Sequence, residues 1–334
     1  MTIPEISIVV PMFRESGHVP TVAQTIQSFV AQCAESYEII LIDDGSPDDT
    51  WAHMSRAARE VPGVVAVRLS RNFGKEYAVA AGLERARGRC VVVMDGDLQH
   101  PPALIPRMVK IWRGGEADVV EAVKTSRGDE GSLNAVLANG FYSMLKKLSG
   151  FDLQNASDFK LLDRKVVAAW LRLRERNLFF RGMTAWLGFR RVQVPFEVPP
   201  RVGGRSQWSF YALLRLAMTA ITAFSSSLLQ LVTLMGMVFL GFALLLGAYT
   251  VLLWVLGRAV TGFSTVIVLL LIVGSVLMMS LGIIGLYLGR IYDEIKARPR
   301  YLVAETAGFD PLDGEDLLPG SDDGAVDLAD RLRR

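Results

Sequence analysis

Two aspartates, Asp95 and Asp97, stand one residue apart directly after an apolar run of strand length at residues 91–94. In an extended segment residues i and i+2 point to the same side, so the two carboxylates can be presented together. Paired carboxylate oxygens suit Mg²⁺ or Mn²⁺, and such an ion suits a diphosphate. A turn in which an aspartate caps the following helix would explain the same residues, because Asp-Gly is common in turns. The pair alone leaves both interpretations open.

Polar residues also follow the other strand-like runs in the first hundred residues. Buried strands are expected at residues 6–11, 37–42 and 64–69, with helical spacing of apolar residues between them, as at residues 18–32. This alternation of strand and helix predicts an α/β fold with a mostly parallel sheet and right-handed crossovers. Ligands on such sheets bind beyond the carboxyl ends of the strands. The polar clusters there are residues 11–15, 43–44, 71–75 and 95–97.

Composition and missing motifs argue against several classes of protein. No G-x-G-x-x-G and no Walker loop follows a strand, which argues against a dinucleotide-binding fold and a P-loop ATPase. The charge is nearly balanced, with 36 basic and 34 acidic residues, so no dedicated nucleic-acid surface is indicated. Cys33 and Cys90 lie far apart without histidine or cysteine neighbours at ligand spacing, so we expect buried thiols in a reducing compartment.

The middle of the chain has a mixed pattern. Residues 118–123 and 190–198 are expected to form strands, the second with the alternation of an edge strand, and residues 134–148 and 165–174 are expected to form helices. Two prolines then close this region. The first five residues lack the basic and apolar regions of a signal peptide. We therefore expect a cytosolic α/β domain at residues 1–208.

Most of the excess hydrophobicity lies beyond residue 209. Residues 209–227 have the spacing of an amphipathic helix that lies in the membrane interface. They lead into two uncharged stretches, residues 228–256 and 263–288, each long enough to span a bilayer. Residues 289–334 form a cytosolic tail that we expect to be largely disordered after residue 305.

The flanks of the two spans predict their orientation. Basic residues gather before the first span and after the second, whereas the connecting turn has only Arg258. The positive-inside rule then places both termini and the α/β domain in the cytosol, with a hairpin in the inner (plasma) membrane. Gly285 and Gly289 form a small-xxx-small pair, from which we expect a homo-oligomer, although contact within the hairpin would explain the glycines as readily. Neither span has an ionisable residue near its middle, which argues against a channel or transporter.

Six motifs follow one another along the chain, at residues 10–15, 43–46, 71–76, 94–102, 157–164 and 201–208. They include Asp95-Gly96-Asp97 and Ser157-Asp158-Phe159. Their succession resembles that of polyprenyl-phosphate glycosyltransferases, the inverting enzymes related to dolichyl-phosphate mannose synthase and to the bacterial undecaprenyl-phosphate glucosyltransferase. The resemblance extends from about residue 6 to residue 300.

The resemblance implies a GT-A fold and transfer of a sugar from UDP-glucose or a related UDP-hexose to undecaprenyl phosphate, a membrane polyprenol. The product would serve cell-envelope glycan modification, such as that of lipopolysaccharide. By position, the resemblance assigns the nucleotide sugar to Pro11, Phe13, Glu15, Asp43, Asp44, Lys75, Asp95 and Gln99. It assigns Mg²⁺ or Mn²⁺ to Asp95 and Asp97, catalysis to Asp97 and Asp158, and the acceptor phosphate to Lys124, Arg127, Arg201 and Ser206.

Elementary chemistry supports these roles separately. A divalent ion neutralises charge on the nucleoside diphosphate that leaves. A lipid phosphate is already anionic, so Asp158 is expected to orient the acceptor or stabilise an oxocarbenium-like centre more than to act as a strong base. Lysine and arginine offset the repulsion between anionic donor and acceptor. The simpler interpretations make Lys124 and Arg127 surface charges and Asp158 a helix cap.

Three positions depart from the usual pattern of the family. Gln207 stands where lysine is usual, which removes one cation near the expected acceptor phosphate. Lys124 stands where arginine is common, which argues against bidentate phosphate binding there. His100 replaces a frequent acid and is expected to be a turn residue and not a ligand.

Two other functions are compatible with the early motifs. A processive polysaccharide synthase would carry a Gln-x-x-Arg-Trp motif and more spans, and the sequence has neither. A membrane-tethered nucleotide-sugar-binding protein or scaffold without turnover would keep the fold but could dispense with Asp158 or the aspartate pair. All three aspartates are present, which favours the enzyme.

Overall fold

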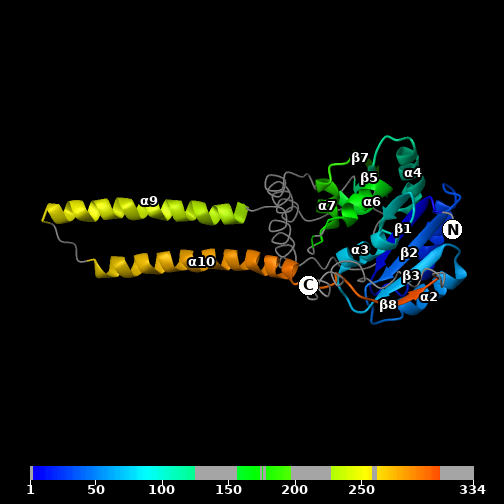
Figure 1. Cartoon of the computed structure of the whole chain (residues 1–334), viewed down its shortest axis with the longest axis horizontal. Coiled ribbons are helices and arrows are strands. Elements are labelled where there is room, and N and C mark those ends of the chain that lie inside the picture. The colour runs from blue at the N-terminus through cyan, green and yellow to red at the C-terminus, as the bar shows by residue number, and fades with distance from the viewer. Residues whose placement is uncertain are drawn as a thin grey trace, which may run out of the picture. The chain divides into compact units, whose positions relative to one another are not determined.

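The computed structural model describes residues 3–124, 156–173, 175, 178–196, 227–257 and 262–308. These residues belong to two units, a sheet with its helices and a pair of long helices (Figure 1). The helix expected at residues 134–148 lies outside the described part of the chain. So does all but the last residue of the interfacial helix expected at residues 209–227.

The first unit is built on one eight-stranded sheet in the order β7-β5-β6-β4-β1-β2-β3-β8. Its strands are β1 (Ile6–Met12), β2 (Tyr37–Asp43), β3 (Val64–Leu69), β4 (Cys90–Val93), β5 (Val119–Lys124), β6 (Ala156–Asp163), β7 (Arg191–Phe196) and β8 (Val303–Ala307). The central strands β4, β1, β2 and β3 are parallel, as the alternation of strands and helices predicted. The flanks differ from that prediction, because β6 and β8 are antiparallel to the strands beside them.

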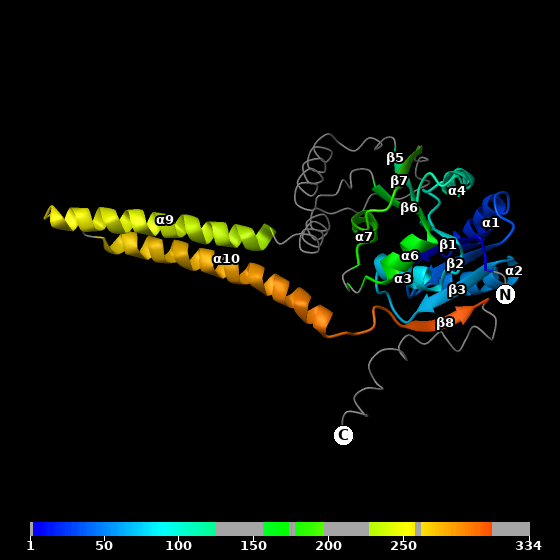
Figure 2. The ribbon, with the colours of Figure 1, turned by 45° about the horizontal axis from the view of Figure 1, so that its top comes forward.

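Helices cover both faces of the parallel strands (Figure 2). In the described part of this unit the α-helices are α1 (Val19–Val30), α2 (Thr50–Glu60), α3 (Lys75–Arg85), α4 (Ile105–Arg113), α6 (Arg164–Leu171) and α7 (Phe180–Trp186). The chain moves from β1 to β2 and β3 in one direction and then returns past β1 to β4. Right-handed crossovers therefore put α1 and α2 on one face and α3 on the other. Coverage on both sides explains why β1 is an apolar run buried along its whole length.

The last strand of the sheet, β8, comes from the segment after the long helices and pairs antiparallel with β3. This differs from the expectation that the α/β domain ends at residue 208, whereas the expectation of a largely disordered tail after residue 305 concerns residues that lie almost entirely outside the described part of the chain. Glu305 lies in the middle of β8, and Tyr301 just before it is 4 % exposed. The strand is short and largely exposed, so its sequence has no strand signature of its own, and pairing with the free edge of β3 defines it. Residues 309–334 lie outside the described part of the chain.

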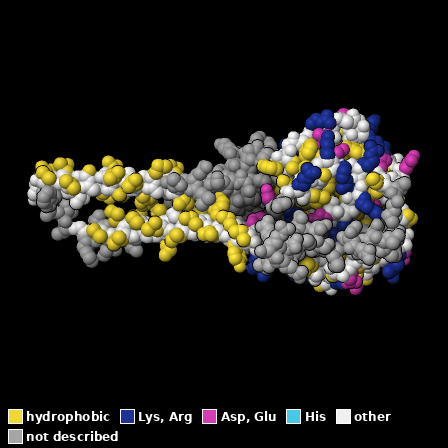
Figure 3. Space-filling view, viewed as in Figure 1, with side chains coloured by type: hydrophobic (Ala, Val, Ile, Leu, Met, Phe, Trp, Pro, Cys, Tyr) yellow, Lys and Arg dark blue, Asp and Glu magenta, His cyan; other side chains and the backbone are white. Residues whose placement is uncertain are grey.

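The second unit consists of α9 (Ser227–Val255) and α10 (Phe263–Ile295), which contact each other side by side (Figures 1 and 2). They cover the spans expected at residues 228–256 and 263–288. Windows at Gly236–Leu253 and Ile272–Gly289 have mean hydropathies of 2.2 and 2.0, and no part of either window is buried in protein. Hydrophobic side chains show along both helices in Figure 3, whereas charged ones gather on the sheet unit. Both helices are long and apolar enough to cross a membrane.

Gly285 and Gly289 belong to α10, and a Cβ placed on either glycine would meet nothing within 4 Å among the described residues. The homo-oligomer stays a prediction.

A buried ion pair lies between β5 and β6. Lys160 is 1 % exposed and Glu121 3 % exposed, and they stand opposite each other in the strand register with Nζ 2.6 Å from Oε1. Burial lowers the pKa of Lys160, and the charge of Glu121 opposes that shift. A charge left without a partner in such a place is costly, so each of the two depends on the other.

We expect Glu121→Ala to lower the free energy of unfolding by about 3–5 kcal/mol, because it leaves the Lys160 ammonium buried without its partner. The double variant Glu121→Leu/Lys160→Met replaces both charges with apolar groups of similar volume. Its free energy of unfolding should be close to that of the wild-type protein. Urea unfolding of the detergent-solubilised chain, followed by tryptophan fluorescence, measures both. A single variant as stable as the double variant would contradict this role for the pair.

Candidate active site

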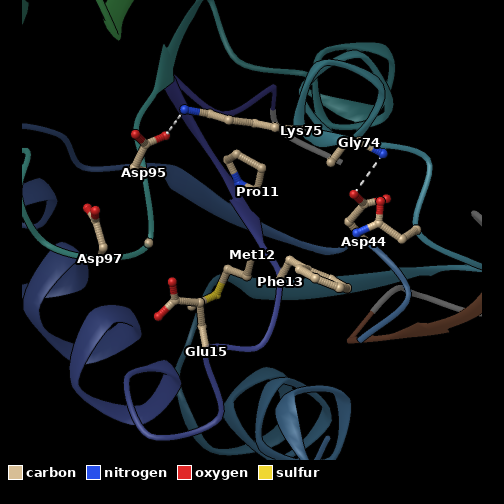
Figure 4. Close-up of a pocket in the computed structure, with 12 residues that line it drawn as sticks. Pro11, Met12, Phe13, Glu15, Asp44, Gly74, Lys75, Asp95 and Asp97 are labelled. Atoms are coloured by element: carbon tan, nitrogen blue, oxygen red, sulfur yellow. Dashed lines mark hydrogen bonds and ion pairs between the residues drawn. The ribbon is translucent and has the colours of Figure 1, made fainter. Parts of the chain in front are cut away.

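A pocket of about 300 Å³ opens at the carboxyl ends of β1 and β2, beside the loops that follow β3 and β4 (Figure 4). It is lined by Pro11, Met12, Phe13, Glu15, Asp44, Asn72, Gly74, Lys75, Ala78, Asp95, Gly96 and Asp97. The parallel pairing of the four central strands brings these loops to one edge of the sheet. This is the edge at which the sequence predicted a ligand site.

Asp44 holds the wall of the pocket that follows β3. Its carboxylate accepts hydrogen bonds from the backbone N–H groups of Phe73, at 2.8 Å, and Gly74, at 2.9 Å. Burial raises the pKa of Asp44, and these hydrogen bonds oppose the shift. Gly45, next in the chain, has a φ of +65°, and a Cβ there would lie 2.3 Å from the backbone carbonyl carbon of Arg71. Only glycine lets the two loops come this close.

Two of the residues expected to bind the donor, Asp43 and Gln99, do not line this pocket. Asp43 is fully buried, where its Oδ1 accepts a hydrogen bond from the backbone N–H of Ser46 at 2.9 Å and its Oδ2 lies 3.4 Å from Nε of Arg68. The backbone N–H of Gln99 donates to Oδ1 of Asp97 at 3.0 Å. Asp43 therefore supports the pocket wall, and Gln99 helps to orient Asp97.

Asp95 and Asp97 line the pocket from a turn and not from the end of a strand. β4 ends at Val93, and Gly96 and Asp97 form a turn, so the pair does not lie on an extended strand. The argument from alternation along a strand was therefore wrong for this pair. In Figure 4 both side chains nevertheless lie on the same side of the pocket.

The buried side chain of His100 supports this turn through a hydrogen bond. Its Nδ1 accepts a hydrogen bond from the backbone N–H of Asp95 at 3.1 Å, so a neutral ring carries its proton on Nε2. The ring stacks on Phe159, with centroids 5.3 Å apart, and meets Phe196 edge-on at 6.2 Å. Burial lowers the pKa of His100, which favours the neutral ring. His100 is a buried turn residue, in keeping with the expectation from the sequence.

Lys75 joins Asp95 to Asp158. Its Nζ lies 2.5 Å from Oδ1 of Asp95 and 2.6 Å from Oδ2 of Asp158. Asp95 follows the end of β4, and Asp158 belongs to β6, the strand that pairs with β4. Two carboxylates in such positions repel each other, and the ammonium between them offsets the repulsion.

Arg181 completes this cluster, and none of the sequence motifs predicted it. Its Nε lies 2.6 Å from Oδ1 of Asp158 and its Nη2 lies 2.9 Å from Oδ2, which makes a bidentate pair. Arg181 belongs to α7, whose first residue, Phe180, donates its backbone N–H to Oε2 of Glu76 at 2.7 Å. The one sequence signal for Arg181 is its isolation in an otherwise uncharged segment, residues 178–187.

Asp158 lies inside β6 and is not a helix cap. The residue that caps α6 is Asp163, which accepts a hydrogen bond from the backbone N–H of Lys165. Burial alone would raise the pKa of Asp158, but the hydrogen bonds and charge of Arg181, together with those of Lys75, hold that pKa well below its usual range. Burial lowers the pKa of Lys75, but the charges and hydrogen bonds of Asp158 and Asp95 together outweigh burial and raise that pKa. Asp158 is therefore ionised and Lys75 protonated at ordinary pH.

The residues expected at the acceptor phosphate are hardly represented in the described structure. Lys124 is the last residue of β5. Arg127, Arg201 and Ser206, together with Gln207, lie outside the described part of the chain.

Asp95 and Asp97 are the pocket residues whose chemistry fits a divalent ion, because they place two hard oxygen donors on one turn. Among the described residues, no group of three or more His, Cys, Asp or Glu side chains is arranged to hold a metal ion. Mg²⁺ is commonly held by one or two carboxylates, with water and substrate phosphates completing its coordination. The two carboxylates therefore fit a metal ion that binds together with a diphosphate.

An acidic pocket at this edge of an α/β sheet is compatible with a glycosyltransferase. Residues 7–172 match the model of the family described as glycosyl transferase family 2. The chain belongs to glycosyl transferase family 2, and the expected GT-A fold is confirmed.

Relatives match nearly the whole chain. It is 38% identical to an uncharacterized glycosyltransferase of Synechocystis sp., over 95% of this chain and 100% of that one. It is 37% identical to the bactoprenol glucosyl transferase of Shigella phage SfX, over 90% of this chain and 98% of that one. The resemblance to polyprenyl-phosphate glycosyltransferases is thereby confirmed. Among solved structures, glucosyl-3-phosphoglycerate synthase from Mycobacterium tuberculosis, in complex with Mn²⁺, UDP and glucosyl-3-phosphoglycerate, is 23% identical, with a TM-score of 0.43 over 65% of this chain and 76% of that chain.

Glu76 makes the stability of this region depend on pH. Burial, followed by the negative charge of Asp158, raises the pKa of Glu76 from 4.5 to about 7. A carboxyl group whose pKa is higher in the folded chain than in the unfolded chain favours folding while it is protonated. Its contribution is fully present below pH 4.5 and is lost as the pH rises to about 7.

We therefore expect the wild-type chain to lose thermal stability between about pH 5 and about pH 7 through this group. Glu76→Gln stays neutral, keeps an acceptor for the N–H of Phe180 and should flatten that part of the profile. Melting temperatures in detergent, taken in small steps of pH, measure the difference. Glu60 is an exposed carboxylate on α2, so Glu60→Gln is the control. If the melting temperature of Glu76→Gln fell with pH as steeply as that of the wild-type chain, the raised pKa would not belong to Glu76.

Proposed function

We propose that this chain transfers glucose, or a closely related hexose, from a UDP-sugar to the phosphate of a membrane polyprenol such as undecaprenyl phosphate. The observation that carries the proposal is the pocket in which Asp95 and Asp97 stand beside the Lys75–Asp158 pair. Two helices of membrane-spanning length in the same chain support a lipid acceptor. Relatives named bactoprenol glucosyl transferase support the choice of sugar and lipid. The product would serve cell-envelope glycan modification.

The donor side of the reaction uses the pocket. Pro11, Phe13 and Glu15 from the end of β1 and the loop held by Asp44 would bind the nucleoside. Mg²⁺ or Mn²⁺ at the aspartate pair, when bound, neutralises charge on the departing nucleoside diphosphate. Lys75 lies beside the same turn and adds a cation near the diphosphate.

Asp158 acts as a fixed negative charge in this proposal and not as a strong base. Arg181 occupies both of its oxygens and Lys75 one of them, and its pKa is well below the usual range. The acceptor phosphate is anionic and needs no deprotonation before it attacks. A preorganised carboxylate at this place stabilises the positive charge that develops on the sugar as the leaving group departs.

The acceptor side is assigned by position in the sequence. Lys124, Arg127, Arg201 and Ser206 would bind the polyprenyl phosphate and offset its repulsion by the donor diphosphate. Residues 209–227 would lie in the membrane interface. We place α9 and α10 across the inner membrane as a hairpin, with both termini cytosolic, because basic residues flank the hairpin at its two outer ends. Donor and lipid phosphate then meet on the cytosolic side.

The purified full-length chain in detergent, given Mg²⁺ or Mn²⁺ and a panel of nucleotide sugars, should transfer sugar to a short polyprenyl phosphate. Asp97→Ala should lower the rate by about 100-fold or more, because a carboxylate that holds the ion is lost. Asp158→Asn should have an effect of similar size, because it removes a charge preorganised for the transition state. Partition of labelled sugar into an organic phase measures the product.

Glu116→Gln is the matched control, since it removes a carboxylate from an exposed position outside the pocket. A wild-type rate in Asp97→Ala would contradict the metal assignment. Absence of lipid-linked product with every donor would contradict the proposed function and favour a binding protein without turnover.

Arg181→Lys should lower kcat about tenfold while the KM for the donor stays within about twofold, because lysine keeps the charge but loses the two parallel hydrogen bonds to Asp158. Initial rates at varied donor concentration separate the two constants. Arg172→Lys, at an exposed position just after α6, is the control. Wild-type kcat in Arg181→Lys would show that Asp158 does not depend on bidentate support.

A further inference from the structure

Three charged side chains stand opposite one another on neighbouring strands of the sheet. In the strand register Asp43 of β2 is paired with Arg68 of β3, and Arg68 is paired with Glu305 of β8. Nη1 of Arg68 lies 2.7 Å from Oε1 of Glu305, and its Nε lies 3.4 Å from Oδ2 of Asp43. The signs alternate, so each charge is attracted by its neighbour. These residues are called the Asp43–Arg68–Glu305 row below.

Both ends of the row are held in place. Oε2 of Glu305 accepts a hydrogen bond from Nε1–H of Trp51 at 2.9 Å, which ties β8 to α2. The hydrogen bond from Arg68 lowers the pKa of Glu305, so this group is a carboxylate at ordinary pH. Asp43 is fully buried, and within the described residues its Oδ2 has no hydrogen bond beside the ion pair with Arg68. A buried carboxylate oxygen of this kind depends on where its cationic neighbour lies.

The row reaches the wall of the donor pocket through Ser46. The backbone N–H of Ser46 donates to Asp43, and its Oγ accepts a hydrogen bond from the backbone N–H of Arg14 at 3.0 Å. Arg14 stands between Phe13 and Glu15, which both line the pocket, and it has a φ of +57°. That conformation is unfavourable for a residue other than glycine and persists only where surrounding contacts hold it.

Arg68 also contacts the same turn directly, because its Nη2 donates to the carbonyl oxygen of Ser46 at 3.4 Å. Asp44, which follows Asp43 in the chain, lines the pocket and holds the loop after β3. A shift of the Arg68 side chain would therefore act on two walls of the pocket, although Arg68 itself does not line it.

We infer that Glu305 is a positioning residue for the nucleotide part of the donor, acting through Arg68 on the turn at residues 43–46 and the loop at residues 13–15. The inference rests on the proposed function, because it takes the pocket to hold a nucleoside diphosphate. Glu305 lies 237 residues beyond Arg68 in the sequence. The segment after the long helices thus contributes to a pocket that is otherwise made by the first hundred residues.

The charge of Glu305 has an effect separate from that of the strand that carries it. Pairing of β8 with β3 uses main-chain groups and would remain if Glu305 lost its charge. The carboxylate directs the guanidinium of Arg68, whose side chain is 32 % exposed and can otherwise turn toward water. The expected effect is on binding of the nucleotide and not on the transfer step, because the Asp158 cluster is not part of the row.

The test compares Glu305→Gln with Glu60→Gln in the full-length chain in detergent. Both changes remove one exposed carboxylate, but Glu60 is paired within α2, with Arg56 at 3.9 Å. Calorimetric titration with UDP, GDP and ADP identifies the nucleotide that the wild-type chain binds best, and initial rates at varied donor concentration follow. We expect Glu305→Gln to raise the nucleotide Kd and the donor KM about three- to fivefold with kcat within about twofold, and Glu60→Gln to change neither.

A second comparison tests the route through Arg68. Arg68→Gln alone should weaken nucleotide binding at least as much as Glu305→Gln, and combining the two should add nothing, because Glu305 acts through Arg68. Arg68→Lys keeps a positive charge beside Asp43 and serves if Arg68→Gln does not fold; adding Glu305→Gln to it should then weaken binding less than in the wild-type background. Melting temperatures of all variants separate unfolding from a local change in the pocket.

Equal nucleotide affinity in Glu305→Gln and Glu60→Gln would overturn the inference, and so would a lower kcat at unchanged KM. Fully additive effects of the two substitutions would overturn the route through Arg68. Absence of nucleotide binding by the wild-type chain would instead overturn the proposed function, and the inference with it.

Discussion

The ammonium of Lys75 between Asp95 and Asp158 is the interaction on which the rest of the site depends. Asp95 follows the end of β4 and Asp158 belongs to the neighbouring strand β6, and the ammonium between them offsets the repulsion of their negative charges. Arg181 then adds two parallel hydrogen bonds to the carboxylate of Asp158. Lys75 and Arg181 thereby connect the turn that carries Asp95 and Asp97 to Asp158.

The mixed sheet serves this arrangement. Its parallel centre gathers the loops after β1, β2, β3 and β4 at one edge, where they form the pocket. A strand antiparallel to β4 presents its first residues at that edge, and this is how β6 delivers Asp158. β8 is antiparallel to β3 for its part, and it adds Glu305 beside Arg68. The antiparallel strands thus supply groups from late in the chain to a pocket built early in it.

Much of this could be predicted from the sequence. Apolar runs ending in polar clusters indicated β1 to β4 and the edge that carries the pocket, because burial on both faces gives a strand a continuous apolar signature. The contact of Arg181 with Asp158 was not predicted, because the sequence around a single arginine does not indicate which residue it contacts. The strand β8 was not predicted, because an exposed edge strand has no continuous apolar run. The prediction that Asp95 and Asp97 lie on an extended strand was wrong, because residue spacing alone does not distinguish a turn from the end of a strand. The expected acceptor residues beyond Lys124 lie outside the described part of the chain.

The sequence by itself determined the family, the α/β class, the acidic residues at the carboxyl edge of the parallel strands and the two helices of membrane-spanning length. These depend on local periodicity, composition and motif order, which can be read along the chain. Only the tertiary structure decided that Asp43 supports the pocket without lining it, that Asp158 is held by Lys75 and Arg181, and that β8 completes the sheet. Each of these features depends on strand register and on contacts between residues far apart in sequence. No local sequence pattern specifies such contacts.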